Sequence, residues 1–192
     1  MIGIILPTRG VVFTKVEDHI EKIRNTSKER IKVFRSYDKP IPESFDFLVK
    51  EALEDKDITH IWFIEEDTVP PLDCLDKLLN VSEDISFIDY GVNGWSCSAK
   101  NSNEKILWCG FGCTMVKRHV FTKVTQPWFR TDKKFRLNTM EWVDVDHKDI
   151  YGGHDVWFFS HAREKGCTFR KIEGECIHLK LSELGKKEIN KG

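Results

Sequence analysis

No stretch of the sequence approaches the run of about 20 apolar residues that a membrane-spanning helix requires. No basic segment precedes the apolar run that begins at Ile2, so we expect a cytoplasmic protein without a secretory signal. Charge of one sign is also missing, because 30 Lys and Arg residues stand against 31 Asp and Glu residues. A formal net charge of −1 therefore gives no general electrostatic basis for binding long nucleic acids or an acidic membrane surface.

Six cysteines are present, but none of them forms a Cys-x-x-Cys pair. Without such a compact pair a zinc site has no obvious anchor, and a domain with a good core needs no disulfides. We therefore expect reduced thiols. The weaker alternative is a zinc site in which the Cys-x-x-x-Cys pair of Cys109 and Cys113 joins Cys167 and Cys176.

Apolar spacing in the first half of the chain predicts strands that alternate with helices. Short apolar runs at 2–6, 31–34, 60–64 and 85–89 indicate buried strands, and helical spacing follows at 11–23, 43–53 and 70–79. This alternation is typical of an α/β fold with a mostly parallel central sheet flanked by helices. The length of 192 residues suits one domain, which we place at 1–182, followed by a Lys-rich tail at 183–192.

The second half of the chain is less regular. We predict a β-rich stretch at 95–116, short helices at 118–124 and 155–165, and one or two last strands within 167–179. The polar segment 131–152 between them has no clear period, which favours a mobile loop over a site.

Three consecutive acids, Glu65-Glu66-Asp67, follow the predicted strand at 60–64. Ligands of open α/β sheets bind beyond the carboxyl ends of the strands, and carboxylate oxygens suit Mg²⁺ or Mn²⁺. The competing interpretation is a solvated acidic turn that caps the next helix.

Asp155 and His178 are the other candidate site residues. Asp155 follows paired glycines and begins a predicted helix, so it is either a helix-terminal acid or a general base. His178 leaves the last predicted strand, where it is either structural or a nitrogen ligand for a metal. A further group of acids around His147 has the weaker claim to a metal, and a solvated loop is the simpler account: Asp144, Asp146 and Asp149.

Taken in order, four blocks of the chain resemble the family 2 nucleotide-sugar glycosyltransferases, which have the GT-A fold and mostly invert the anomeric centre. These blocks are the opening strand with its Pro7-Thr8-Arg9 exit, HIWFIEEDTVPPL at 60–72, the small-residue segment at 110–121, and Gly153-His154-Asp155 with the helix behind it. The resemblance implies a single Rossmann-like GT-A domain and a hexosyltransferase-type activity, with a nucleotide-diphosphate sugar as donor and Mn²⁺ or Mg²⁺ as cofactor.

The same resemblance implies a role for each candidate residue. Glu65 and Asp67 occupy the positions of the DxD motif and His178 that of a C-terminal metal ligand, while Asp155 corresponds to the catalytic base. Donor binding is expected from a set at the strand ends: Pro7, Thr8, Arg9, Asp38 and Glu66.

Three departures from the family pattern matter. Glu65 replaces the first Asp of the motif, His154 replaces a Glu, and only Asp38 fits the base-binding turn after the second strand. The base therefore stays open, as does the acceptor, which is a glycan, a protein, a lipid carrier or a modified nucleobase. The alternative functions are a nucleotidyltransferase of similar layout and a non-catalytic relative that binds a sugar nucleotide.

Overall fold

The computed structural model describes residues 1–8, 10–37, 39–92, 95–136, 139, 141–143 and 151–179. Several sequence predictions fall outside this part of the chain: Arg9, Asp38, the acids around His147, and the Lys-rich tail at 183–192. Among the described helices, none is both long and apolar enough to cross a membrane.

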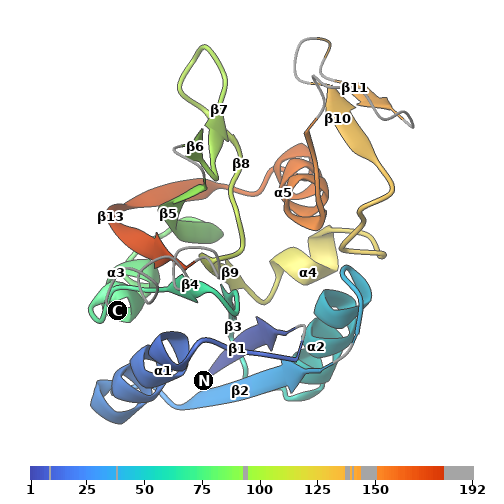
Figure 1. Cartoon of the computed structure of the whole chain (residues 1–192). Coiled ribbons are helices and arrows are strands. Elements are labelled where there is room, and N and C mark those ends of the chain that lie inside the picture. Colours follow the sequence, from blue (N-terminus) through green and yellow to red (C-terminus); the bar gives the residue numbers. More distant parts are fainter. Residues whose placement is uncertain are drawn as a thin grey trace, which may run out of the picture.

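A mixed sheet of eight strands forms the centre of the molecule (Figure 1), in the order β2-β1-β3-β9-β5-β13-β4 with β6 paired to β5. Its strands are β1 (Ile2–Pro7), β2 (Ile31–Ser36), β3 (His60–Ile64), β4 (Thr68–Val69), β5 (Ile85–Val92), β6 (Trp95–Ser96), β9 (Cys113–Lys117) and β13 (Phe169–His178).

The expected mostly parallel, Rossmann-like GT-A sheet flanked by helices is wrong. Of the seven pairings between the described strands of this sheet, the β1·β2, β1·β3 and β5·β13 pairings are parallel and the other four are antiparallel. The main cause is β9, which enters between β3 and β5 and pairs antiparallel with both. A helical crossover is required only between parallel neighbours, so a strand reached by a loop can run the opposite way.

Five helices cover the sheet within the described residues, and they divide between two hydrophobic clusters. Helices α1 (Thr14–Thr26) and α3 (Cys74–Leu79) supply one cluster. Helices α2 (Glu43–Glu54), α4 (Val120–Lys123) and α5 (His154–Glu164) supply the other. Alternate residues of β1 and β3 belong to opposite clusters, as the two-residue period of a strand requires.

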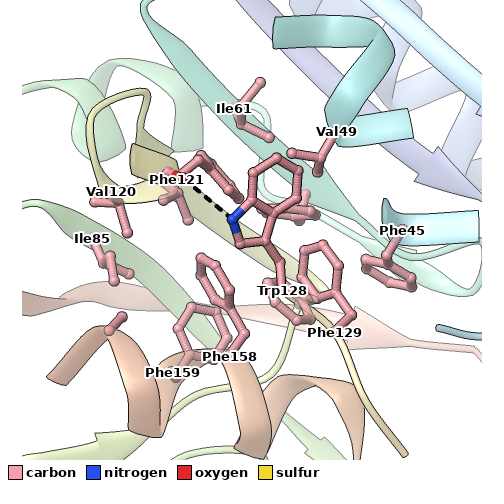
Figure 2. Packing of buried hydrophobic residues seen from close by; sticks show 14 of the residues in the cluster. Phe45, Val49, Ile61, Ile85, Val120, Phe121, Trp128, Phe129, Phe158 and Phe159 are labelled. Atoms are coloured by element: carbon pink, nitrogen blue, oxygen red, sulfur yellow. Dashed lines mark hydrogen bonds between the residues drawn. The ribbon is translucent and has the colours of Figure 1, made fainter. Parts of the chain in front are cut away.

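The second cluster is rich in aromatic rings, and Trp128 lies within it (Figure 2). Its indole Nε1 donates to the carbonyl oxygens of Phe121 at 3.2 Å and Val124 at 3.0 Å, so this buried polar atom is satisfied. Phe129 and Phe158 stack with ring centroids 5.3 Å apart in the same cluster. Phe158 of α5 also stacks on Phe121 of α4, so these rings fix the position of α5, whose first turn contains the predicted catalytic residue Asp155.

Two small antiparallel sheets complete the described structure. One pairs β7 (Ala99–Lys100) with β8 (Ile106–Trp108), within the stretch predicted to be β-rich. The other joins β10 (Lys134–Arg136) to β11 (Glu141–Val143) and β12 (Tyr151–Gly152). The prediction of an irregular loop at 131–152 is therefore wrong where β10, β11 and β12 form. These strands are too short to produce a visible period in the sequence.

Arg118 connects the end of β9 with the end of α2. Its guanidinium donates to the carbonyl oxygens of Leu53 at 2.5 Å, Asp55 at 2.7 Å and Ile58 at 2.9 Å. The last carbonyls of a helix have no partner inside the helix, and the half-buried Arg118 satisfies that of Leu53 and that of the C-cap residue Asp55 here, together with that of Ile58 beyond the helix.

We expect Arg118→Met to lower the free energy of unfolding by ~2–4 kcal/mol, because three partly buried carbonyls lose a charged donor. Urea denaturation followed by circular dichroism measures the change. The matched control is Arg170→Met, whose exposed guanidinium pairs with Glu83 at 2.6 Å and whose loss is expected to cost under ~1 kcal/mol. Equal costs for the two variants would contradict the role given to Arg118.

Candidate functional site

A cavity of ≈ 200 Å³ opens at the edge of the sheet where β1 and β3 end. Strands β1, β2 and β3 are mutually parallel, so their carboxyl ends meet at this edge. Strand β13 ends at the same edge, because two antiparallel steps through β9 restore the direction of β3 in β5, with which β13 is parallel. The described residues that line the cavity are Pro7, Thr8, Lys39, Ile41, Ser44, Phe45, Glu65, Glu66, Asp67 and His178.

The structure brings most of the candidate residues together here. Six of them line the cavity: Pro7, Thr8, Glu65, Glu66, Asp67 and His178. Asp155 is not among the lining residues, but it lies close enough to Glu65 to repel its carboxylate. Arg9 and Asp38 lie outside the described residues. Lys39, Ile41, Ser44 and Phe45 are additional lining residues that the sequence patterns did not single out.

The meeting of Asp67 with His178 depends on one short strand pairing. Strand β13 pairs antiparallel with β4, which places His178 opposite Thr68. The Leu179 N–H donates to the carbonyl oxygen of Asp67 at 2.7 Å and continues the same contact. As a result His178 Nε2 lies 3.4 Å from Asp67 Oδ2, and both side chains are largely buried.

Glu65 is the most perturbed acid of the site. Burial raises its pKa to about 8, with repulsion from Asp155 as the next cause and smaller repulsions from Asp67 and Glu66. A hydrogen bond from the Tyr90 hydroxyl to Glu65 Oε2 at 2.9 Å acts in the opposite direction and only partly compensates. Glu65 is therefore protonated at neutral pH while no cation or ligand shares the charge.

Tyr90 is a site residue that the sequence analysis missed. Its ring stacks on that of His178, with centroids 5.7 Å apart and an interplanar angle of 26°. A Cβ atom on Gly110 would lie 2.3 Å from the Tyr90 hydroxyl oxygen, and one on Gly112 would lie 2.6 Å from the Tyr90 ring. The absence of side chains at Gly110 and Gly112 thus leaves room for the Tyr90 ring. These two glycines are the feature of the sequence that could have indicated a bulky residue packed against this segment.

Asp155 stands in the first turn of α5, where its Oδ1 accepts a hydrogen bond from the Val156 N–H at 2.8 Å. The helix-terminal interpretation is therefore correct as far as this bond goes. Gly153 has φ 157°, and a Cβ there would lie 2.4 Å from Asp155 Oδ1. A glycine is needed at this position so that the Asp155 carboxylate can lie over it.

His154 packs between two aromatic rings. Its imidazole centroid is 4.3 Å from that of Phe45 and 5.4 Å from that of Phe111, and it stacks on Phe111 at 16°. Burial lowers the pKa of His154, so the imidazole is neutral at neutral pH. It joins the first turn of α5 to the first turn of α2, from which Phe45 comes.

The metal ligands expected from the sequence are only partly assembled. Among the described residues, no three His, Cys, Asp or Glu side chains form a metal-binding group, and Glu65 is engaged with Tyr90. Asp67 and His178 do fit, because adjacent ligands at ~2.1 Å in an octahedron lie ~3.0 Å apart, near the observed 3.4 Å. The buried Nδ1 of His178, the ring nitrogen not used in this distance, has no hydrogen-bond partner in the structure. Mg²⁺ and Mn²⁺ usually complete their shells with water and phosphate oxygens.

The cysteines do not support the alternative zinc site. Within the described residues all six are free thiols. Cys109 Sγ lies 3.9 Å from Thr114 Oγ1 in the cluster that α2, α4 and α5 supply, whereas Cys113 belongs to the other cluster with Cys74 and Cys176. The two members of the Cys-x-x-x-Cys pair thus have different neighbours.

No protein-family model matches the sequence, and neither does any curated protein. Among solved structures, A197 from STIV has the same fold, with a TM-score of 0.63 and 17% identity over 93% of this chain and 85% of that one. At that identity the match shows the fold alone. A glycosyltransferase involved in the glycosylation of the major capsid of PBCV-1 gives a TM-score of 0.35 and 13% identity, over 66% of this chain and 69% of that one. A similarity that low carries no functional argument.

We expect Glu65→Gln to stabilise the protein at alkaline pH. The folded wild type holds a proton on Glu65 between the ordinary pKa of 4.5 and about 8, whereas the unfolded chain does not. The wild-type free energy of unfolding therefore falls as pH rises through this window, and the variant lacks that loss. The gain from the substitution should be ~2–4 kcal/mol larger at pH 9 than at pH 5.

Urea denaturation of both proteins at the two pH values measures this difference. Glu51→Gln, at an exposed position of α2, serves as the matched control. A gain for Glu65→Gln that is independent of pH would show that burial and repulsion do not act on the Glu65 carboxyl.

Proposed function

We propose that this protein is a metal-dependent glycosyltransferase that moves a sugar from a nucleotide-diphosphate donor to an acceptor hydroxyl. The observation that carries the proposal is the cavity in which Asp67 and His178, distant in the sequence, lie 3.4 Å apart beside two more acids. Asp155 is a fourth acid in this group, because it lies close enough to Glu65 to raise the pKa of that side chain. Gathering like charges costs stability, and such a cost is typical of a functional site.

The charges that line the cavity favour a cation as cofactor. Glu65, Glu66 and Asp67 face it, and Lys39 is the only Lys or Arg among the described lining residues. A diphosphate would meet net negative charge there unless a divalent ion intervened. Asp67 and His178 would hold Mn²⁺ or Mg²⁺, which would neutralise charge on the leaving nucleotide.

Asp155 would act as the general base. The Val156 N–H donates to one of its carboxylate oxygens at 2.8 Å, which fixes the orientation of the carboxylate. The other carboxylate oxygen would take the proton from the acceptor hydroxyl while the acceptor oxygen attacks the anomeric carbon and the nucleoside diphosphate leaves. Gly153 permits this placement, because a side chain there would displace the carboxylate.

Calorimetric titration with a panel of nucleotide sugars, with Mn²⁺ and then with EDTA, tests donor binding. One donor should bind with Mn²⁺ and fail to bind with EDTA, and Asp67→Ala should weaken that binding at least tenfold because the cation loses a charged ligand. Asp57→Ala, which removes an exposed partner of Arg30, should bind like the wild type. Failure of every donor to bind wild type with Mn²⁺ would refute the proposed function.

Asp155→Asn tests the chemical step separately from donor binding. The amide keeps an oxygen that accepts from the Val156 N–H but cannot take up a proton, so donor affinity should stay within threefold of wild type. Release of nucleoside diphosphate in the presence of an acceptor should fall by ~10²–10⁴-fold. A variant that turned over at the wild-type rate would exclude Asp155 as the base.

A further inference from the structure

The wall of the cavity formed by the β2–α2 loop and α2 carries polar groups that the proposed chemistry leaves without a role. Lys39, on the loop, lines the cavity with an exposed side chain. Its Nζ lies 4.6 Å from the ring centroid of Phe47, a contact that is weak where the ring is exposed, as it is here. Lys39 therefore lies at the cavity, and a ligand that bound its ammonium group would disturb only a weak contact with Phe47.

Ser44, in the first turn of α2, is 1% exposed and lines the same cavity. Its buried hydroxyl oxygen has no hydrogen-bond partner in the structure. Leaving a buried hydroxyl unsatisfied costs free energy, and folded proteins seldom do so without a reason. An oxygen-rich ligand in the cavity would supply the missing partner.

The backbone of α2 does not account for this wall by itself. The Ser44 N–H donates to the Pro40 carbonyl oxygen at 3.0 Å, and the Phe45 N–H donates to that of Pro42 at 3.0 Å. These donors at the start of the helix are already used by the loop, so recognition at this wall falls to the two side chains. Both supply donors, and one is a cation, so together they select a group that is anionic and rich in acceptor oxygens.

We propose that Lys39 and Ser44 bind the diphosphate of the donor in the cavity that they share with Asp67, the residue proposed to hold the cation. This assignment rests on the proposed function and adds two donor-binding residues to it. The same wall would discriminate against neutral nucleosides, which offer it no anionic oxygen.

Titration of the 192-residue protein with UDP, GDP, CDP, ADP and dTDP in the presence of Mn²⁺ tests the assignment. For the diphosphate that binds wild type, Lys39→Met should raise Kd about tenfold and Ser44→Ala about threefold. Affinity for Mn²⁺ alone should not fall, because no hydrogen bond or ion pair joins either residue to Asp67 or His178 in the described structure, and Lys39→Met removes a positive charge from the cavity. Lys50→Met, at an exposed position of α2, should bind like the wild type.

Unfolding measurements separate a ligand-binding hydroxyl from a structural one. Ser44→Ala should be at least as stable as wild type, because the hydroxyl it removes has no partner to lose. Ser86→Ala is the matched control: this buried hydroxyl donates to the Leu78 carbonyl oxygen at 2.7 Å, so its removal should destabilise the protein and leave Kd unchanged.

The outcomes distinguish this inference from the function on which it rests. A wild type that binds none of the five diphosphates with Mn²⁺ overturns both. A wild type that binds one of them, with unchanged Kd in both Lys39→Met and Ser44→Ala, overturns the inference alone. Loss of stability in Ser44→Ala comparable to that in Ser86→Ala also overturns the role given to Ser44.

Discussion

The pairing of β13 with β4 is the contact on which the candidate site depends. Only two residue pairs form it, Ile177 with Val69 and His178 with Thr68. Strand β4 lies directly after the acids that follow β3, so this pairing fastens the last described strand to the acidic turn. Without it His178 would have no defined position relative to Asp67. A ladder this short is weak by itself, and its stability comes from the long parallel pairing of β13 with β5.

The fold bears a cost to keep this arrangement. Glu65 is buried beside like charges, and the Tyr90 hydroxyl that binds it compensates only in part. Ser44 and His178 each keep a buried polar atom without a partner. The aromatic cluster behind the cavity offsets these losses, because large buried rings supply most of the hydrophobic stabilisation in a domain of this size. Several unfavourable groups around one cavity indicate a functional site more strongly than any one of them does. A protein without a function there would have little reason to retain them together.

The sequence was informative where a local pattern determines local structure. The apolar runs that became β1 and β3 are buried on both faces, so their strands and the acids after them could be placed from sequence. The direction of β9 could not, because a single apolar run carries no information about which strand it pairs with. Helix α1 begins at Thr14, later than the pattern predicts, because residues 11–13 share its apolar spacing but precede the helix. Tyr90 and Ser44 became site residues only through tertiary packing, and no local spacing marks such residues.

The packing of His154 gives a physical reason for a histidine, rather than a Glu, at this position. The resemblance in sequence predicts a Glu before Asp155, but this position lies between the rings of Phe45 and Phe111. A carboxylate there would be buried beside Asp155, whose charge already adds to the effect of burial in raising the pKa of Glu65 to about 8. A neutral imidazole fills the same space without another negative charge, and it stacks where a carboxylate cannot. Phe45 follows Ser44 and His154 precedes Asp155, so one layer of packed rings joins the cavity wall at Ser44 to Asp155. Close packing permits little relative motion across such a layer, so Ser44 and Asp155 keep a fixed position relative to each other.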